Sequence, residues 1–91
     1  MKLAWDETLA RRVMKIAEAT AINKDECVSG YTLSYETTSR LWGCDQCLLS
    51  EVVNNLVVSG YLWANVSNPC EAILFGTTQA WADRDAMLPN P

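Results

Sequence analysis

Two successive helix-start and helix-stop signals in the middle of the chain restrict its possible folds most strongly. Ser34 is a favourable N-cap, and Gly43 can take the left-handed conformation that ends a helix, which predicts a helix over residues 35–42. Asp45 is a second N-cap before an apolar stripe that stops at Ser59-Gly60, which predicts a helix over residues 46–58. The stripe consists of Leu49, Val52, Val53 and Leu56. Two helices joined by a short turn with a glycine form a helix-turn-helix unit.

The flanking sequence predicts helices at both ends and short strands around the central unit. Leu9, Val13 and Ile16 recur at helical spacing, whereas the residues after Gly60 are β-branched and aromatic with a turn at 67–69. The expected elements are a helix over 6–20, strands over 28–33, 61–66 and 71–75, and a last helix from Thr77 or Thr78 to Met87. At 91 residues the chain has room for one domain, residues 1–91, of the α+β class, mainly α with a small antiparallel β-hairpin.

The segment from Leu33 to Trp63 resembles the winged helix-turn-helix of MarR-type bacterial and phage regulators. The resemblance lies in Leu33-Ser34, in Leu41-Trp42-Gly43 and in Leu56-x-x-x-Gly60-Tyr61-Leu62. It implies that the helix over 46–58 would enter the major groove of DNA and that the following hairpin, the wing, would touch the DNA backbone. It also implies a homodimer through the terminal helices, with Trp5 and Trp81 near the contact.

The distribution of charge argues against ordinary DNA binding. The chain has seven Lys and Arg residues and a net charge of −4, and none of the seven lies between Leu41 and Asp83. That segment contains the expected reading helix and wing, together with Asp45, Glu51 and Glu71. Because Lys and Arg on phosphates supply much of the affinity for DNA, this surface is poorly suited to bind it.

Surplus apolar residues instead favour a protein partner. Leu48, Val57 and Val58 exceed what one face of the helix over 46–58 needs, so at least some should be exposed. The expected partner-binding residues are Leu48, Glu51, Val57, Val58, Tyr61 and Trp63. Tyr61, Trp63 and Phe75 could also be core residues of a small sheet, and Trp42 is expected in the core. The sequence therefore predicts an acidic winged-helix protein-binding module, for example a phage or mobile-element inhibitor of the anti-CRISPR kind.

The alternative function is a DNA-binding transcriptional regulator. In that case Gln46, Ser50, Asn54 and Arg40 would contact DNA, because amides can pair with adenine, although Gln46, Asn54 and Asn55 could equally be solvated. Arg11, Arg12 and Lys15, doubled by the symmetry of a dimer, would then have to supply the missing positive charge.

Catalytic and metal-binding functions have little support in the composition. The chain has no histidine, which removes the commonest general base, so we expect no enzyme. Four cysteines could hold zinc, and Cys44-Asp-Gln-Cys47 could be a redox pair. However, antiparallel pairing of the strand over 28–33 with the strand over 71–75 would separate Cys27 from Cys70 by several residues. We therefore expect free thiols and no cofactor. No apolar run or secretory signal is present, which predicts a cytoplasmic protein without a membrane segment.

Overall fold

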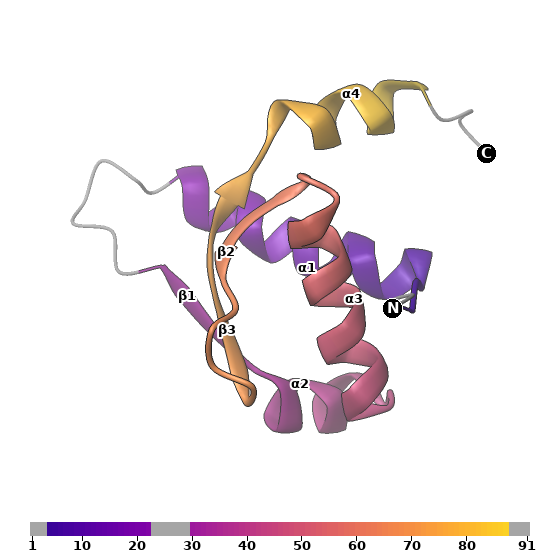
Figure 1. Ribbon diagram of the computed structural model, residues 1–91, viewed down its shortest axis with the longest axis vertical. Helices are drawn as coiled ribbons and strands as arrows, with labels where there is room; N and C mark the ends of the chain where they lie inside the picture. Colours follow the sequence, from indigo (N-terminus) through magenta and orange to yellow (C-terminus); the bar gives the residue numbers. More distant parts are fainter. Residues whose placement is uncertain (1–3, 23–29, 88–91) are drawn as a thin grey trace.

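The computed structural model describes residues 4–22 and 30–87, which form four helices and a three-stranded antiparallel sheet (Figure 1). The elements in chain order are α1 (Glu7–Ile22), β1 (Tyr31–Ser34), α2 (Tyr35–Trp42), α3 (Gln46–Val58), β2 (Leu62–Asn65), β3 (Glu71–Thr77) and α4 (Gln79–Met87). The described residues thus form a small α+β domain, as the sequence predicted.

The central pair of helices has the predicted bounds. The Ser34 hydroxyl accepts a hydrogen bond from the backbone N–H of Thr37 at the start of α2, and the Asp45 carboxylate accepts one from Leu48 at the start of α3. Gly43 ends α2 with a φ of 67°, in the left-handed region that favours glycine. The capping residues therefore fix both helices and the turn between them.

The sheet has the order β1-β3-β2, with the last strand along the chain at its centre. β1 pairs antiparallel with β3 from Tyr31 opposite Leu74 to Ser34 opposite Glu71, which confirms the pairing expected from sequence. The pairing of β2 with β3 shifts between Trp63 and Ala64, which lie opposite Gly76 and Leu74. Phe75 is thus the extra residue of a β-bulge, an arrangement that strengthens twist and redirects side chains.

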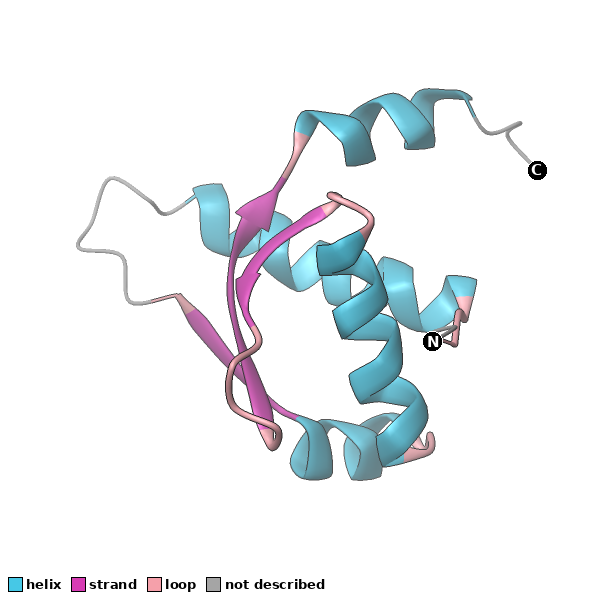
Figure 2. Cartoon of the chain, in the orientation of Figure 1, coloured by secondary structure: helices cyan, strands magenta, loops and turns pink. Residues whose placement is uncertain are grey.

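One apolar core joins α1, α3 and the inner face of the sheet. Figure 2 shows how these helices and strands are arranged. Side chains alternate along β3, so that Ala72 and Leu74 are buried on the inner face. The predicted inward stripe of α3 is fully buried, and α1 contributes Leu9, Ala10, Val13, Met14 and Ala17. The described helices and strands therefore share a single core.

Several boundaries differ from the sequence prediction, and four of the strand ends shift by one or two residues, since β1 ends at Ser34, β2 spans Leu62–Asn65 and β3 continues to Thr77. α1 begins at Glu7 rather than residue 6, because Asp6 is its N-cap and accepts a hydrogen bond from the backbone N–H of Leu9 at 3.0 Å. α1 continues to Ile22 through an alanine-rich end, which favours helix. β1 begins only at Tyr31, because Gly30 has a φ of +76° and is not extended. The expected loop at 23–26 and the start of the expected strand at 28–29 lie outside the described residues.

Trp42 was predicted in the core, and this is wrong in part. It is half-buried at the end of α2 and packs on the edge of the core. The guanidinium of Arg12 on α1 lies 5.5 Å from the centroid of the Trp42 ring, within the range of a cation–π contact. Because the last residue of a short helix lies at its margin, one face of the ring remains available to a basic side chain.

The Tyr35 hydroxyl is buried without a hydrogen-bond partner among the described residues. Burial raises the pKa of Tyr35, and the neighbouring Asn54 side chain opposes this only in part. Because an unpaired buried hydroxyl costs free energy, Tyr35→Phe should leave the free energy of unfolding unchanged within about 1 kcal/mol or raise it. Tyr35→Ala should lose about 3–5 kcal/mol by leaving a cavity. Urea unfolding of both variants checks this, and a large loss in the Phe variant would reveal a hydrogen bond to the hydroxyl.

Candidate protein-contact surface

The apolar residues of α3 that were expected to exceed the core do not form one surface. Leu48 and Val57 are both half-buried and pack against the core. They are nine positions apart, and at about 100° per residue they lie on opposite sides of the helix. Both therefore lie at the margins of the buried stripe and are only partly accessible, and their contact with a partner stays a prediction.

Val58 and Glu51 point more fully away from the core. Val58 is 78% exposed at the end of α3, and Glu51 is partly exposed two turns earlier. The exposed apolar surface of α3 among the expected contact residues is thus limited to Val58. A single exposed valine is common on protein surfaces and does not define a binding site.

The residues of the DNA-binding alternative lie on or near α3, but several are engaged within the chain. Ser50 donates a hydrogen bond to the Cys47 carbonyl, and Asn54 donates one to the Ser50 carbonyl at 2.7 Å. Arg40 forms an ion pair with Glu36 at 2.7 Å on α2. Gln46 is exposed in the first turn. This group therefore provides an exposed amide but no unpaired positive charge.

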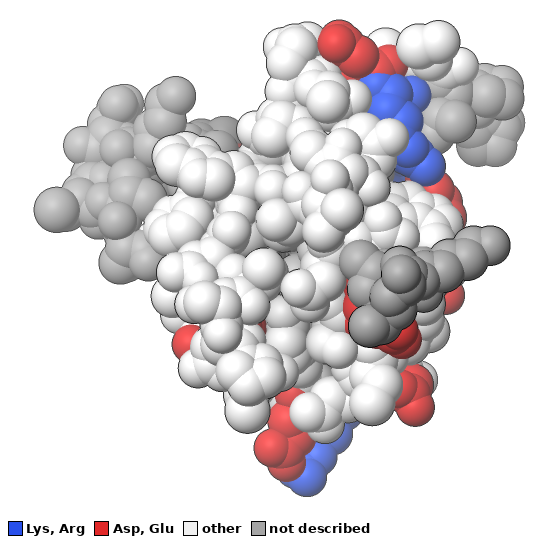
Figure 3. All heavy atoms as spheres, viewed as in Figure 1, with Lys and Arg blue, Asp and Glu red and all other residues white. Residues whose placement is uncertain are grey.

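The described arginines outside this group are similarly engaged, whereas Lys15 on α1 is exposed. Arg11 and Arg84 contact carboxylates, and Arg12 lies over Trp42. In the view of Figure 3, blue atoms occur at the upper right and at the lower edge, and most of the face between them carries neither sign of charge. The visible surface over α3 and the hairpin is therefore largely uncharged.

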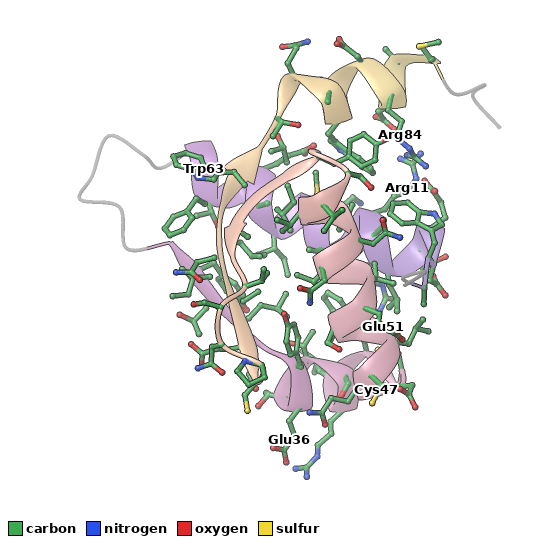
Figure 4. All side chains as sticks on the ribbon, viewed as in Figure 1. Arg11, Glu36, Cys47, Glu51, Trp63 and Arg84 are labelled. Atoms are coloured by element: carbon green, nitrogen blue, oxygen red, sulfur yellow. The ribbon has the colours of Figure 1, made fainter. Side chains whose placement is uncertain are left out.

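The largest exposed aromatic side chain belongs to the sheet. Trp63 is 66% exposed, and its ring lies 5.5 Å from that of Phe75, centroid to centroid, at an interplanar angle of 42°. Figure 4 shows Trp63 on the side of the sheet away from α3. Ile73 also lies on this outer face, because it alternates with the inward Ala72 and Leu74. We call Trp63, Phe75 and Ile73 the outer sheet patch.

Gly30 brings the backbone close against this patch. A Cβ atom at Gly30 would lie 2.7 Å from Ile73 Cγ2 and 2.9 Å from Phe75 Cε1, which is closer than van der Waals contact. The positive φ of Gly30 independently disfavours other residues. A glycine is therefore needed for the chain to enter β1 beside Ile73 and Phe75.

The sequence prediction included Trp63 as a partner-binding residue but treated Phe75 only as a candidate core residue and did not consider Ile73. Alternation along a strand could have placed Ile73 and Phe75 together on one face, but because residues 72–75 are all apolar the sequence does not show which face is buried. The bulge at Phe75, which accompanies its contact with Trp63, has no comparable signal in the sequence.

Tyr61, another expected contact residue, lies in a second group of side chains between α1 and α4. We call this group the Arg84 cluster, which consists of Arg84, Trp5, Glu7, Tyr61 and Trp81. The Arg84 guanidinium bonds both carboxylate oxygens of Glu7, at 2.7 and 3.3 Å. It lies 5.4, 5.7 and 5.0 Å from the ring centroids of Trp5, Tyr61 and Trp81, respectively.

The electrostatics of this cluster favour charged forms of both partners. The hydrogen bonds from Arg84 lower the pKa of Glu7 and outweigh partial desolvation, and Trp5 and Arg11 act in the same direction as Arg84. The same pairing raises the pKa of Arg84. Arg11 contacts Glu7 at 3.0 Å and Asp85 at 2.8 Å, so that α4 is joined to the first turn of α1 by two arginines.

Trp5 and Trp81 were expected at a homodimer contact. Trp81 is only 4% exposed and packs edge-on against Tyr61 within its own chain, so its ring has little surface left for a second chain. Trp5 is 39% exposed. Contacts between residues so distant in sequence are invisible to local patterns, which explains why the two tryptophans could not be assigned to one intramolecular cluster. Homodimer formation itself stays a prediction.

The described cysteines do not gather into a metal site. Cys44 is half-buried against the core, whereas Cys47 and Cys70 are exposed. Within residues 4–22 and 30–87, no three His, Cys, Asp or Glu side chains are arranged to hold a metal ion. Cys27 lies outside the described residues.

Comparisons with protein-family models, curated proteins and solved structures found no match. None of the helices in the described part of the chain has both the length and the apolar character needed to cross a membrane.

The two neighbouring valines at the end of α3 provide a matched test of its surface. Val58→Asp should change the free energy of unfolding by no more than about 0.5 kcal/mol, because the residue is exposed. Val57→Asp should lose about 1–3 kcal/mol, because a carboxylate would replace a side chain packed on the core. Chemical denaturation measures both values. Equal effects of the two substitutions would contradict the position of α3 relative to the core.

The Glu7–Arg84 pair predicts a specific dependence of stability on pH. Because the pKa of Glu7 is lowered in the folded protein, its contribution is complete above the ordinary value of 4.5 and is lost as pH falls through the lower folded pKa. Glu7→Gln removes this titration. Comparison of thermal midpoints from pH 7 down to pH 3 should therefore show the two proteins converging at acid pH, whereas a constant difference would contradict the pairing.

Proposed function

We propose that this protein is a protein-binding module with a winged-helix-like layout, and that it contacts its partner through the outer sheet patch. The single observation that carries the proposal is the exposure of Trp63 beside Phe75. Exposed tryptophans supported by other apolar side chains are frequent anchors of protein interfaces. Ile73 extends this apolar surface along β3.

The partner's chemistry follows from the charges around the patch. Glu71 is the single charged residue within the three described strands, and the whole chain has a net charge of −4. Basic groups on a partner would therefore be attracted, while an acidic partner would be repelled. We infer that the partner is a protein with an apolar socket for Trp63 and basic residues around it. An inhibitor that occupies such a surface, as in the anti-CRISPR kind, is consistent with this chemistry.

Affinity capture with two matched variants tests the proposal. Trp63→Ser removes the exposed ring of the patch, and Leu41→Ser removes an apolar side chain that is 80% exposed at the end of α2. Proteins captured from the native cell by the natural chain should be lost with Trp63→Ser and retained with Leu41→Ser. Both variants should keep their thermal midpoints within a few degrees. Undiminished capture by the Trp63 variant would overturn this location of the contact.

A nucleic-acid measurement distinguishes the alternative function. Because the described arginines of α1, α2 and α4 are mostly engaged with carboxylates or rings, we expect neither retention on heparin nor a mobility shift with duplex DNA at physiological salt. Sub-micromolar duplex binding that weakens steeply with salt would instead favour a DNA-binding regulator.

A further inference from the structure

The Arg84 cluster has the composition of a recognition site for a cation, although its ligand belongs to the same chain. A carboxylate and three aromatic rings surround one guanidinium. Trp5 and Glu7 come from the beginning of the described chain, Tyr61 precedes β2, and Trp81 comes from α4. Glu7 and Arg84, which are 77 positions apart in the sequence, are thus in direct contact.

The geometry selects a guanidinium over an ammonium ion. Two nitrogens of Arg84 reach the two oxygens of Glu7, which is the bidentate pairing that a planar guanidinium allows. The ring contacts add to this, because a guanidinium is weakly hydrated and packs well against aromatic faces. A lysine-type ammonium can bond one carboxylate but cannot reproduce the paired geometry.

The cluster is also open to solvent. The Arg84 side chain is 22% exposed and Trp5 is 39% exposed, whereas Trp81 is almost completely buried. Figure 4 shows Arg84 and Arg11 in the space between α4 and α1, and Figure 3 shows basic atoms at the surface there. The Arg84 side chain thus borders solvent, while Trp81 is packed against Tyr61.

We propose that Trp5, Glu7, Tyr61 and Trp81 form a guanidinium-binding site, that Arg84 is its resident ligand, and that the site accepts an arginine side chain of another protein in place of Arg84. This site is separate from the outer sheet patch and does not depend on the proposed function. Replacement of Arg84 would remove one of the two arginine contacts that join α4 to α1, while Arg11 would retain the contact with Asp85.

The experiment replaces the resident ligand with a soluble one. Arg84→Ala should lower the thermal midpoint, and millimolar N-ethylguanidinium should restore part of the loss in a saturable manner. Butylammonium at the same ionic strength should not. Tryptophan fluorescence should follow the same guanidinium titration, since Trp5 and Trp81 line the site. On the natural chain the same ligand should bind roughly tenfold more weakly, because Arg84 competes for the site.

Two controls make the result specific. Glu7→Gln combined with Arg84→Ala should abolish the rescue, because the paired acceptor is lost. Arg40→Ala removes an exposed arginine that pairs with Glu36 outside the cluster, and its thermal midpoint should respond to the guanidinium ligand no more than that of the natural chain. If Arg84→Ala does not fold, Arg84→Lys keeps the positive charge and allows the same titration. Equal effects of the guanidinium and ammonium ligands, or a rescue that survives Glu7→Gln, would overturn the proposal.

Discussion

The packing of α1 against the central strand β3 is the contact on which the rest of the fold depends. Small buried residues on both elements, Ala10 and Ala17 on α1 and Ala72 on β3, allow the helix to lie close to the strand. β3 then supports β1 on one edge and β2 on the other, and α3 covers the same core. Because side chains alternate along a strand, burial of Ala72 and Leu74 requires Ile73 and Phe75 to face outward. The outer sheet patch is thus a direct consequence of the core.

Local signals were sufficient for most of the fold. Ser34, Gly43 and Asp45 act through their own backbone neighbourhood, and the bounds of α2 and α3 were therefore predicted correctly. The buried stripe of α3 was also predicted, since helical periodicity identifies the centre of an apolar face. Periodicity does not give the width of that face, which depends on neighbouring elements. For this reason Leu48 and Val57 were counted as surplus to the buried face, although both pack in part on the core.

The candidate sites were less predictable because they depend on tertiary contacts. Trp63 was identified as a candidate anchor of an interface. Its ring contacts Phe75 at a β-bulge, and no turn or capping residue in the sequence indicates that bulge. Trp5 and Trp81 were both singled out, yet their shared contact with Arg84 joins the two ends of the described chain.

Net charge was an equally incomplete guide to the electrostatic character of the surface. It gives the balance of acidic and basic residues, whereas the structure shows that the described arginines are held by carboxylates or rings.

The pairing of arginines has a consequence for how this protein could meet a partner. An arginine held by a carboxylate contributes little net field at a distance, so the excess acidic groups dominate long-range attraction. At short range, the exposed Trp63 provides apolar area without a charge that must be desolvated, since the strands around it contain only Glu71. In the proposed function, acidic groups elsewhere on the domain would attract a basic surface, and the uncharged aromatic face would make the contact. This division of roles would favour a protein partner over nucleic acid, because phosphate groups are repelled by the same acidic groups.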